Sequence, residues 1–146
     1  QDLAIASLLG GMALANAKLG AVHGFAAPLG GMFPVPHGVA CAALLPHVMR
    51  VNIQALRERE PASQALQRYQ EIARLLTGDP QAQPEAGADW VEELSRSLKI
   101  PHLAAYGISP SDFEVLIEKG RQASSMKGNP IQLNPVELET ILARAV

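Results

Sequence analysis

The sequence predicts an all-α domain, and three features carry that prediction. Apolar residues recur at helical spacing, helix-start signals precede several of these runs, and no stretch alternates apolar and polar residues as a half-buried strand does. The chain has 146 residues and is 48% hydrophobic, which is enough for one domain with a buried core. We therefore expect residues 1–146 to form a single helical bundle of about six to seven helices.

The first third of the chain predicts two long apolar helices. Residues 3–19 are apolar nearly all round, which predicts a helix buried on most faces, with Gly10 and Gly11 placed for close approach of another backbone and Gly20 at its end. A short helix over residues 21–27 should stop near Pro28, and a bend should run to Pro36. A second long apolar helix begins at residue 38 and continues to about residue 56, with a kink at Pro46.

The rest of the chain is more polar and predicts shorter helices. Apolar residues over 62–76 recur at helical spacing before Gly78, residues 79–88 read as a loop, and residues 90–98 form the next helix. One turn is expected at 103–106. The last two helices have start signals, Ser109 before Pro110 and Asn134 before Pro135, and residues 124–130 between them are expected to be an exposed loop.

Composition excludes several classes of partner. The net charge is −2 and no basic stripe appears, so we expect no nucleic-acid partner, and no stretch predicts a convincing membrane span. The single cysteine, Cys41, leaves no internal disulfide and fits a reducing compartment, so a cytoplasmic location is predicted and Cys41 is expected to pack as a small hydrophobe. The chain starts without Met and almost at once enters an apolar helix, which suggests a piece of a larger protein.

Two histidines mark the candidate site. His23 and His37 lie fourteen residues apart on either side of a segment rich in Gly and Pro, a composition that indicates a backbone folded to bring particular groups together. Neutral imidazole is the commonest metal ligand among side chains, and the positive end of a helix dipole at His37 favours the neutral form. The alternative is a pair of buried or capping histidines. His47 and His102 are expected to be structural or exposed.

The residues around this pair resemble the C-terminal helical domain of the iron-containing (group III) alcohol dehydrogenases, which are related to dehydroquinate synthase and glycerol dehydrogenase. The matching stretches are residues 6–7, 11, 16–24, 28–30, 36–40 and 44–49, together with Asn52 and Asn129-Pro130. The resemblance covers essentially the whole chain. It is dense over residues 6–52 and loose between residues 60 and 125.

The resemblance implies a function in a larger enzyme. In that family one metal, Fe(II) or sometimes Zn(II), is held by an aspartate and three histidines, and the last two histidines match His23 and His37. Nothing here matches the other two ligands or the N-terminal NAD(P)-binding domain, so the chain should be an inactive C-terminal fragment of a homo-oligomeric, two-domain dehydrogenase. The metal would polarise the carbonyl or alkoxide oxygen of a small alcohol, aldehyde or ketone while hydride moves to or from the nicotinamide.

The chain departs from the family pattern at one position, and two alternative functions stay open. Many family members carry a further histidine four residues after the first, where this chain has Ala27, so no catalytic residue is assigned and the cofactor-binding residues stay unknown. Phe25, Leu29 and Phe33 are expected to form an apolar wall of the cleft. The chain could instead be a helical interaction module without chemistry, or a glycerol-dehydrogenase-like member of the same superfamily.

Overall fold

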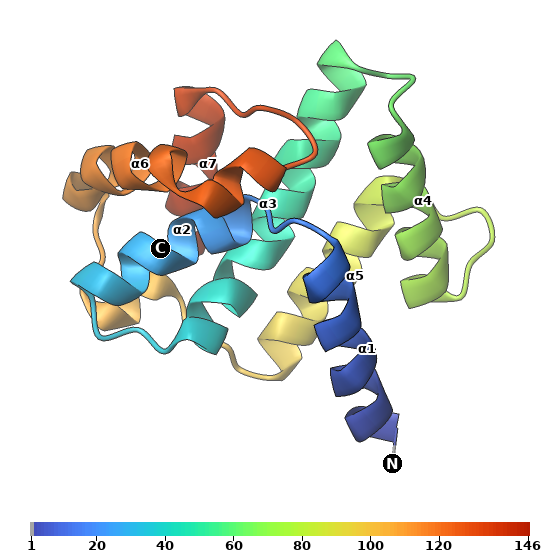
Figure 1. Cartoon of the computed structure of the whole chain (residues 1–146), viewed down its shortest axis with the longest axis horizontal. Coiled ribbons are helices and arrows are strands. Elements are labelled where there is room, and N and C mark those ends of the chain that lie inside the picture. Colours follow the sequence, from blue (N-terminus) through green and yellow to red (C-terminus); the bar gives the residue numbers. More distant parts are fainter. Residues whose placement is uncertain (1) are drawn as a thin grey trace.

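The computed structural model describes residues 2–146, and this part of the chain folds into helices without a β-strand (Figure 1). The prediction of an all-α fold is confirmed. The seven α-helices are α1 (Asp2–Asn16), α2 (Ala21–Met32), α3 (His37–Arg59), α4 (Gln64–Thr77), α5 (Pro84–Ser97), α6 (Phe113–Gln122) and α7 (Pro135–Ala145). Three 3₁₀ helices connect them: η1 (Leu103–Tyr106), η2 (Pro110–Asp112) and η3 (Ser124–Gly128).

Helix α3 is the centre of the domain, because it packs against α2 and α7 on one side and against α4 and α5 on the other (Figure 1). Its apolar residues, with those of α2, α6 and α7, form the main core, in which Leu44 and Leu56 are fully buried. A smaller core of Met49, Ile53 and Ala88 joins α3 to α5. This arrangement explains why α3 is apolar on more than one face.

The helix starts and stops follow the local signals in the sequence. Gly78 ends α4 and Gly107 ends η1, both with the positive φ that glycine adopts without strain. Ser109 with Asp112, and Asn134 with Glu137, form capping boxes in which each side chain pairs with the backbone of the other residue. These caps satisfy N–H groups that the first helical turn leaves without a partner.

Two predicted boundaries were wrong around the histidines. Helix α2 does not stop near Pro28 but includes it and continues to Met32, so the bend shrinks to residues 33–36. The fully buried Leu29, one residue after Pro28, explains this, because core packing offsets the hydrogen bond that proline cannot make. Helix α3 also starts one residue earlier than predicted, at His37.

Two predicted loops are also partly helical. Helix α5 begins at Pro84, inside the loop expected over 79–88, because proline is favoured in the first turn of a helix. The segment expected as an exposed loop at 124–130 contains η3, and its Gly128 lies so close to residue 19 that a Cβ there would sit 2.0 Å from the Leu19 carbonyl oxygen. The segment is therefore packed against the start of α2 rather than free.

Helix α1 contradicts the burial predicted for it. Every residue of α1 is exposed within the described chain, including Leu3 at 87% and Leu8 at 65%, and the helix projects from the body of the domain in Figure 1. Within residues 2–146, a Cβ placed at Gly10 or Gly11 would have nothing within 4 Å, so the close approach predicted there is not seen. The apolar pattern correctly predicted a helix, but residues 2–146 contain no surface that covers the apolar side chains of α1.

Helix α3 is long and apolar enough to cross a bilayer by length and composition, whereas the sequence predicted no convincing membrane span. In the domain, 61% of the relevant stretch is buried against other helices. Its apolar character is accounted for by its central place in the core.

Candidate metal centre

The packing of α2 against α3 brings the two predicted histidines together. His23 lies in the first turn of α2, His37 is the first residue of α3, and residues 33–36 turn the chain between the two helices. The ring centroids are 5.4 Å apart, with the ring planes tilted by 54°. The two imidazoles, fourteen residues apart in the sequence, therefore lie close enough to bind one shared metal ion.

A third potential ligand lies beside them. Cys41 follows His37 by one helical turn, and its Sγ is 3.5 Å from His37 Nε2 and 3.9 Å from His23 Nε2. One ligand atom from each of the three residues lies within 4.8 Å of the others. Burial raises the pKa of the Cys41 thiol, so without a metal it is protonated at neutral pH. Cys41 also packs half-buried against the main core, as its apolar surroundings in the sequence predict. Its spacing of four residues from His37 additionally indicates a shared helix face.

A cavity of about 560 Å³ opens beside this cluster. His23 and Cys41 line it, and much of the remaining wall comes from apolar side chains such as Val22, Leu45 and Val48. His37 is exposed at the start of α3 and is not part of the wall. The cluster thus lies where a small molecule in the cavity could approach an ion bound by these residues.

A buried polar network holds the helix that carries His23. Asn129 accepts a hydrogen bond from the Ala21 N–H at 3.0 Å, which caps the first turn of α2 from across the chain. The Asn129 amide also donates to Asn52 Oδ1 at 2.7 Å and to the Ile131 carbonyl at 2.8 Å. Asn52, only 1% exposed, donates in turn to the Tyr69 hydroxyl at 3.0 Å. These bonds connect α2, α3, α4 and the segment after η3.

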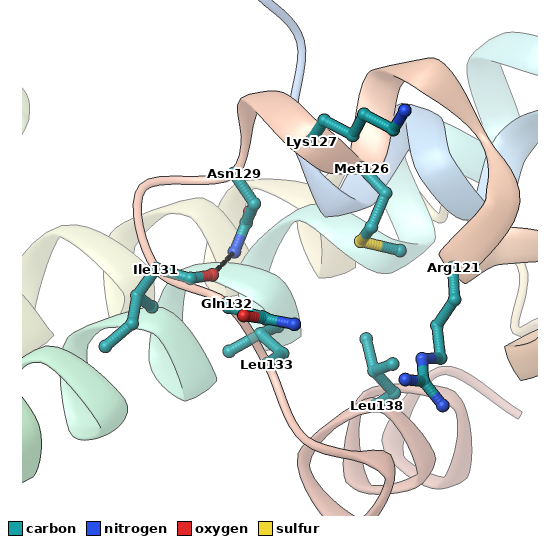
Figure 2. Close-up of a pocket in the computed structure, with 8 residues that line it drawn as sticks. All are labelled: Arg121, Met126, Lys127, Asn129, Ile131, Gln132, Leu133 and Leu138. Carbon is teal, nitrogen blue, oxygen red and sulfur yellow. Dashed lines mark hydrogen bonds between the residues drawn. The ribbon is translucent and has the colours of Figure 1, made fainter.

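Asn129 also lines a second cavity, of about 330 Å³, drawn in Figure 2. Met126, Leu133 and Leu138 give it an apolar interior, and Arg121 and Lys127 are its charged residues. Figure 2 shows the Asn129 amide turned toward the Ile131 carbonyl rather than into open space. This second cavity has no histidine, cysteine or carboxylate in its wall, so it lacks metal ligands.

The structure also places the other residues named from the sequence. Ala27 is exposed on α2, one turn after His23, and offers no polar group. The predicted apolar wall was wrong for Phe25 and Leu29, which are 0% exposed and belong to the main core, while Phe33 packs half-buried against that core. Helical periodicity could not distinguish a side chain facing the cleft from one facing α6 and α7.

The two remaining histidines lie outside the cluster. His47 on α3 is half-buried, its Nδ1 has no hydrogen-bond partner within the described residues, and burial lowers its pKa. His102, before η1, is exposed. Both line a third, smaller cavity, away from His23 and His37.

Comparison with known proteins identifies the family. The family model for the "Fe-containing alcohol dehydrogenase family, C-terminal" matches residues 1–146. The chain belongs to the iron-containing alcohol dehydrogenase family. Membership in this family implies a metal and a nicotinamide cofactor in the complete enzymes.

Iron-containing alcohol dehydrogenases of known sequence align with the whole of this chain. It is 37% identical over 145 residues to alcohol dehydrogenase 4 of Saccharomyces cerevisiae, an alignment that covers 99% of this chain and 36% of the relative. It is 38% identical over 146 residues to 1,3-propanediol dehydrogenase of Klebsiella pneumoniae, covering 99% of this chain and 37% of the relative. The chain thus spans little more than a third of the length of these relatives.

Solved structures share the helical fold. An alcohol dehydrogenase from Oenococcus oeni matches with a TM-score of 0.79 and 30% sequence identity, over 94% of this chain and 35% of that one. A 1,3-propanediol oxidoreductase matches with a TM-score of 0.75 and 31% identity, over 88% of this chain and 33% of that one. The helical arrangement around α3 is therefore that of this family's solved members.

The residues at the cluster fit a divalent metal. Two imidazoles and one thiol are donor types that transition metals accept, and one ligand atom from each residue lies within 4.8 Å of the others.

Proposed function

We propose that this chain is the metal-binding helical domain of a nicotinamide-dependent alcohol dehydrogenase, with His23 and His37 as two of the metal ligands. The observation that carries the proposal is the 5.4 Å separation of the two imidazole rings, on different helices, in a chain that belongs to this family. Fe(II) or Zn(II) is the proposed ion. The substrate class is a small alcohol, aldehyde or ketone, in keeping with the names of the relatives.

The chain's own residues supply binding and position in this proposal. His37 is the first residue of α3 and is exposed, so its ring is accessible to an ion. Asn129 fixes the first turn of α2 and thereby the direction of His23. When bound, the metal would act as a Lewis acid on the substrate oxygen. Since Ala27 provides no donor group, a proton would have to leave by another route.

We further propose that the domain works as the C-terminal part of a two-domain, homo-oligomeric dehydrogenase and has no oxidoreductase activity by itself. The relatives are nearly three times as long as the aligned region. The exposed apolar face of α1, which includes Leu3, Leu8 and Leu9, is a surface that a further part of such an enzyme would cover. A cytoplasmic location remains a prediction from the single cysteine.

A domain exchange tests the proposed function. This chain replaces the aligned segment of the Klebsiella pneumoniae 1,3-propanediol dehydrogenase, and the purified hybrid is assayed for metal content and for propanediol oxidation coupled to NAD⁺ reduction. We expect His23→Ala and His37→Ala each to abolish metal retention and activity, because each removes a ligand. The exposed His102→Ala serves as the matched control. Full metal content and activity in both ligand variants would refute the assignment.

The alternative of a helical interaction module without chemistry draws on the same exposed surface of α1. It predicts that neither the hybrid nor the chain itself takes up iron or zinc. A glycerol-dehydrogenase-like activity is distinguished by offering glycerol and 1,3-propanediol to the same hybrid.

A further inference from the structure

We propose that Cys41 is a third ligand of the metal held by His23 and His37, so that this chain carries a His₂Cys site and favours Zn(II) over harder divalent ions such as Mn(II). The inference rests on the proposed function of the two histidines. The ligand set that the family resemblance implies contains an aspartate and three histidines but no thiolate, so the cysteine is an addition to it.

The distances suit a shared ion. With metal–nitrogen bonds of 2.0–2.1 Å and a metal–sulfur bond of about 2.3 Å, tetrahedral angles place the nitrogen and sulfur atoms about 3.6 Å apart. The Cys41 Sγ is 3.5 Å from His37 Nε2 and 3.9 Å from His23 Nε2. Both separations fall within a few tenths of an ångström of the ligating distance, so small side-chain rotations would complete the geometry.

A thiol has one proton, so Cys41 can donate to one of the two nearby ring nitrogens, while its sulfur accepts from the other when that nitrogen carries a hydrogen. A cation among the three atoms would satisfy all of them at once. On metal binding the S–H bond breaks, the proton passes to solvent, and the sulfur forms a bond to the metal without any change of oxidation state.

The elements hold Cys41 in this position. His37 and Cys41 are spaced four residues apart on α3, so both side chains project from the same face of that helix. That face meets the first turn of α2, where Asn129 fixes the backbone next to His23. The sulfur is half-buried and borders the large cavity, so an ion can reach it.

Adding a thiolate changes which metals bind well. Thiolates are soft ligands that favour zinc over harder ions such as Mn(II), whereas an aspartate and histidine set suits Fe(II) and Mn(II) as well. Removing Cys41 should therefore lower the affinity for Zn(II) more than the affinity for Mn(II). A residue that only packs beside the histidines would affect both metals alike.

The test loads this chain with Co(II) under reducing, anaerobic conditions. We expect one Co(II) per chain, visible d–d bands typical of tetrahedral coordination, and a near-ultraviolet thiolate-to-cobalt charge-transfer band. Because Cys41 is the only cysteine in the sequence, that band can come from no other residue. Zinc X-ray absorption should show a sulfur at about 2.3 Å.

Three variants separate the possible outcomes. Cys41→Ala should lose the charge-transfer band. Its Zn(II) affinity should fall by at least about tenfold, which is the smallest loss expected even for a residue that only hydrogen-bonds to a metal ligand. Mn(II) affinity should change less, and far-ultraviolet circular dichroism confirms the fold. His102→Ala should leave every signal unchanged. Cys41→Ser, similar in size, should behave like Cys41→Ala.

Three results would overturn the inference, and they bear differently on the proposed function. Cobalt d–d bands without a charge-transfer band, or equal losses of Zn(II) and Mn(II) affinity in Cys41→Ala, would exclude Cys41 and leave the histidine pair standing. No metal uptake by the folded chain would exclude a self-sufficient His₂Cys site. The domain exchange would still decide whether His23 and His37 act with ligands from elsewhere.

Discussion

Replacing Asn129 with alanine should destabilise the domain by about 2–4 kcal/mol and loosen the start of α2. Asn129 is half-buried, and its side chain makes hydrogen bonds to α2, to α3 and, within its own segment, to Ile131. It accepts from the Ala21 N–H, exchanges hydrogen bonds with Asn52, and donates to the Ile131 carbonyl. Among the described residues no other side chain is seen to cap α2, whose N-cap residue, Gly20, has no side chain to do so.

The magnitude follows from the groups left without partners. Losing the cap on the Ala21 N–H costs about 1 kcal/mol, as for other N-cap residues changed to alanine. The Asn52 carboxamide, 1% exposed, loses its partner for Oδ1, and an unsatisfied buried acceptor costs about 1–3 kcal/mol. The two terms add up to about 2–4 kcal/mol before any rearrangement of the segment around Asn129.

Asn134 provides a matched control, because its side chain also caps a helix by accepting from the Glu137 N–H at 2.9 Å. That bond is exposed to solvent, so Asn134→Ala should cost only about 1 kcal/mol. Urea unfolding followed by circular dichroism would measure both variants, with the m-value checked for a common two-state transition. If Asn129→Ala cost no more than Asn134→Ala, the buried network would not be what stabilises this region.

Three further predictions concern packing, close approach and pH. Leu29→Ala, in the core, should cost about 2–5 kcal/mol in thermal or urea unfolding, whereas Leu75→Ala, 82% exposed, should stay within about 0.5 kcal/mol. Gly128→Ala should prevent stable folding, because its Cβ would meet the Leu19 carbonyl. Gly30→Ala, at an exposed position of α2, should stabilise by up to about 1 kcal/mol in the same urea assay. Burial lowers the pKa of His47, so the unfolded chain binds its proton more readily and the free energy of unfolding falls as pH drops below about 6.5. His47→Asn should lose that share of the pH dependence in unfolding measured from pH 8 to about 5.

The sequence predicted helix ends well where a local chemical signal decides them. Ser109 with Asp112, and Asn134 with Glu137, make the capping boxes that their spacing indicates, and Gly78 ends its helix in the left-handed conformation. Such signals act within a few residues of the chain. These helix-end signals can therefore be recognised in the sequence without knowing what the helix packs against.

Predictions failed where packing outweighs a local signal. Pro28 was expected to end a helix, but the burial of Leu29 keeps α2 continuous to Met32. Helix α1 shows the opposite case, since its apolar residues predicted burial and the described residues contain nothing that covers them. An apolar sequence pattern indicates that a helix face has to be buried, but it does not identify the segment that buries it.

The candidate metal centre depends both on a local sequence signal and on packing between distant segments. The spacing of His37 and Cys41 is local, so the sequence alone could have placed them on one face of α3. The contact with His23 depends on how α2 packs, and that packing depends on Phe25 and Leu29 in the core and on Asn129, more than a hundred residues further along the chain. Changes to those positioning residues should therefore weaken metal binding without touching a ligand. Asn129→Ala offers the direct measurement, because its Zn(II) affinity should fall while Asn134→Ala leaves it unchanged. Equal Zn(II) affinity in the two folded variants would mean that the histidines and Cys41 hold their arrangement without the network.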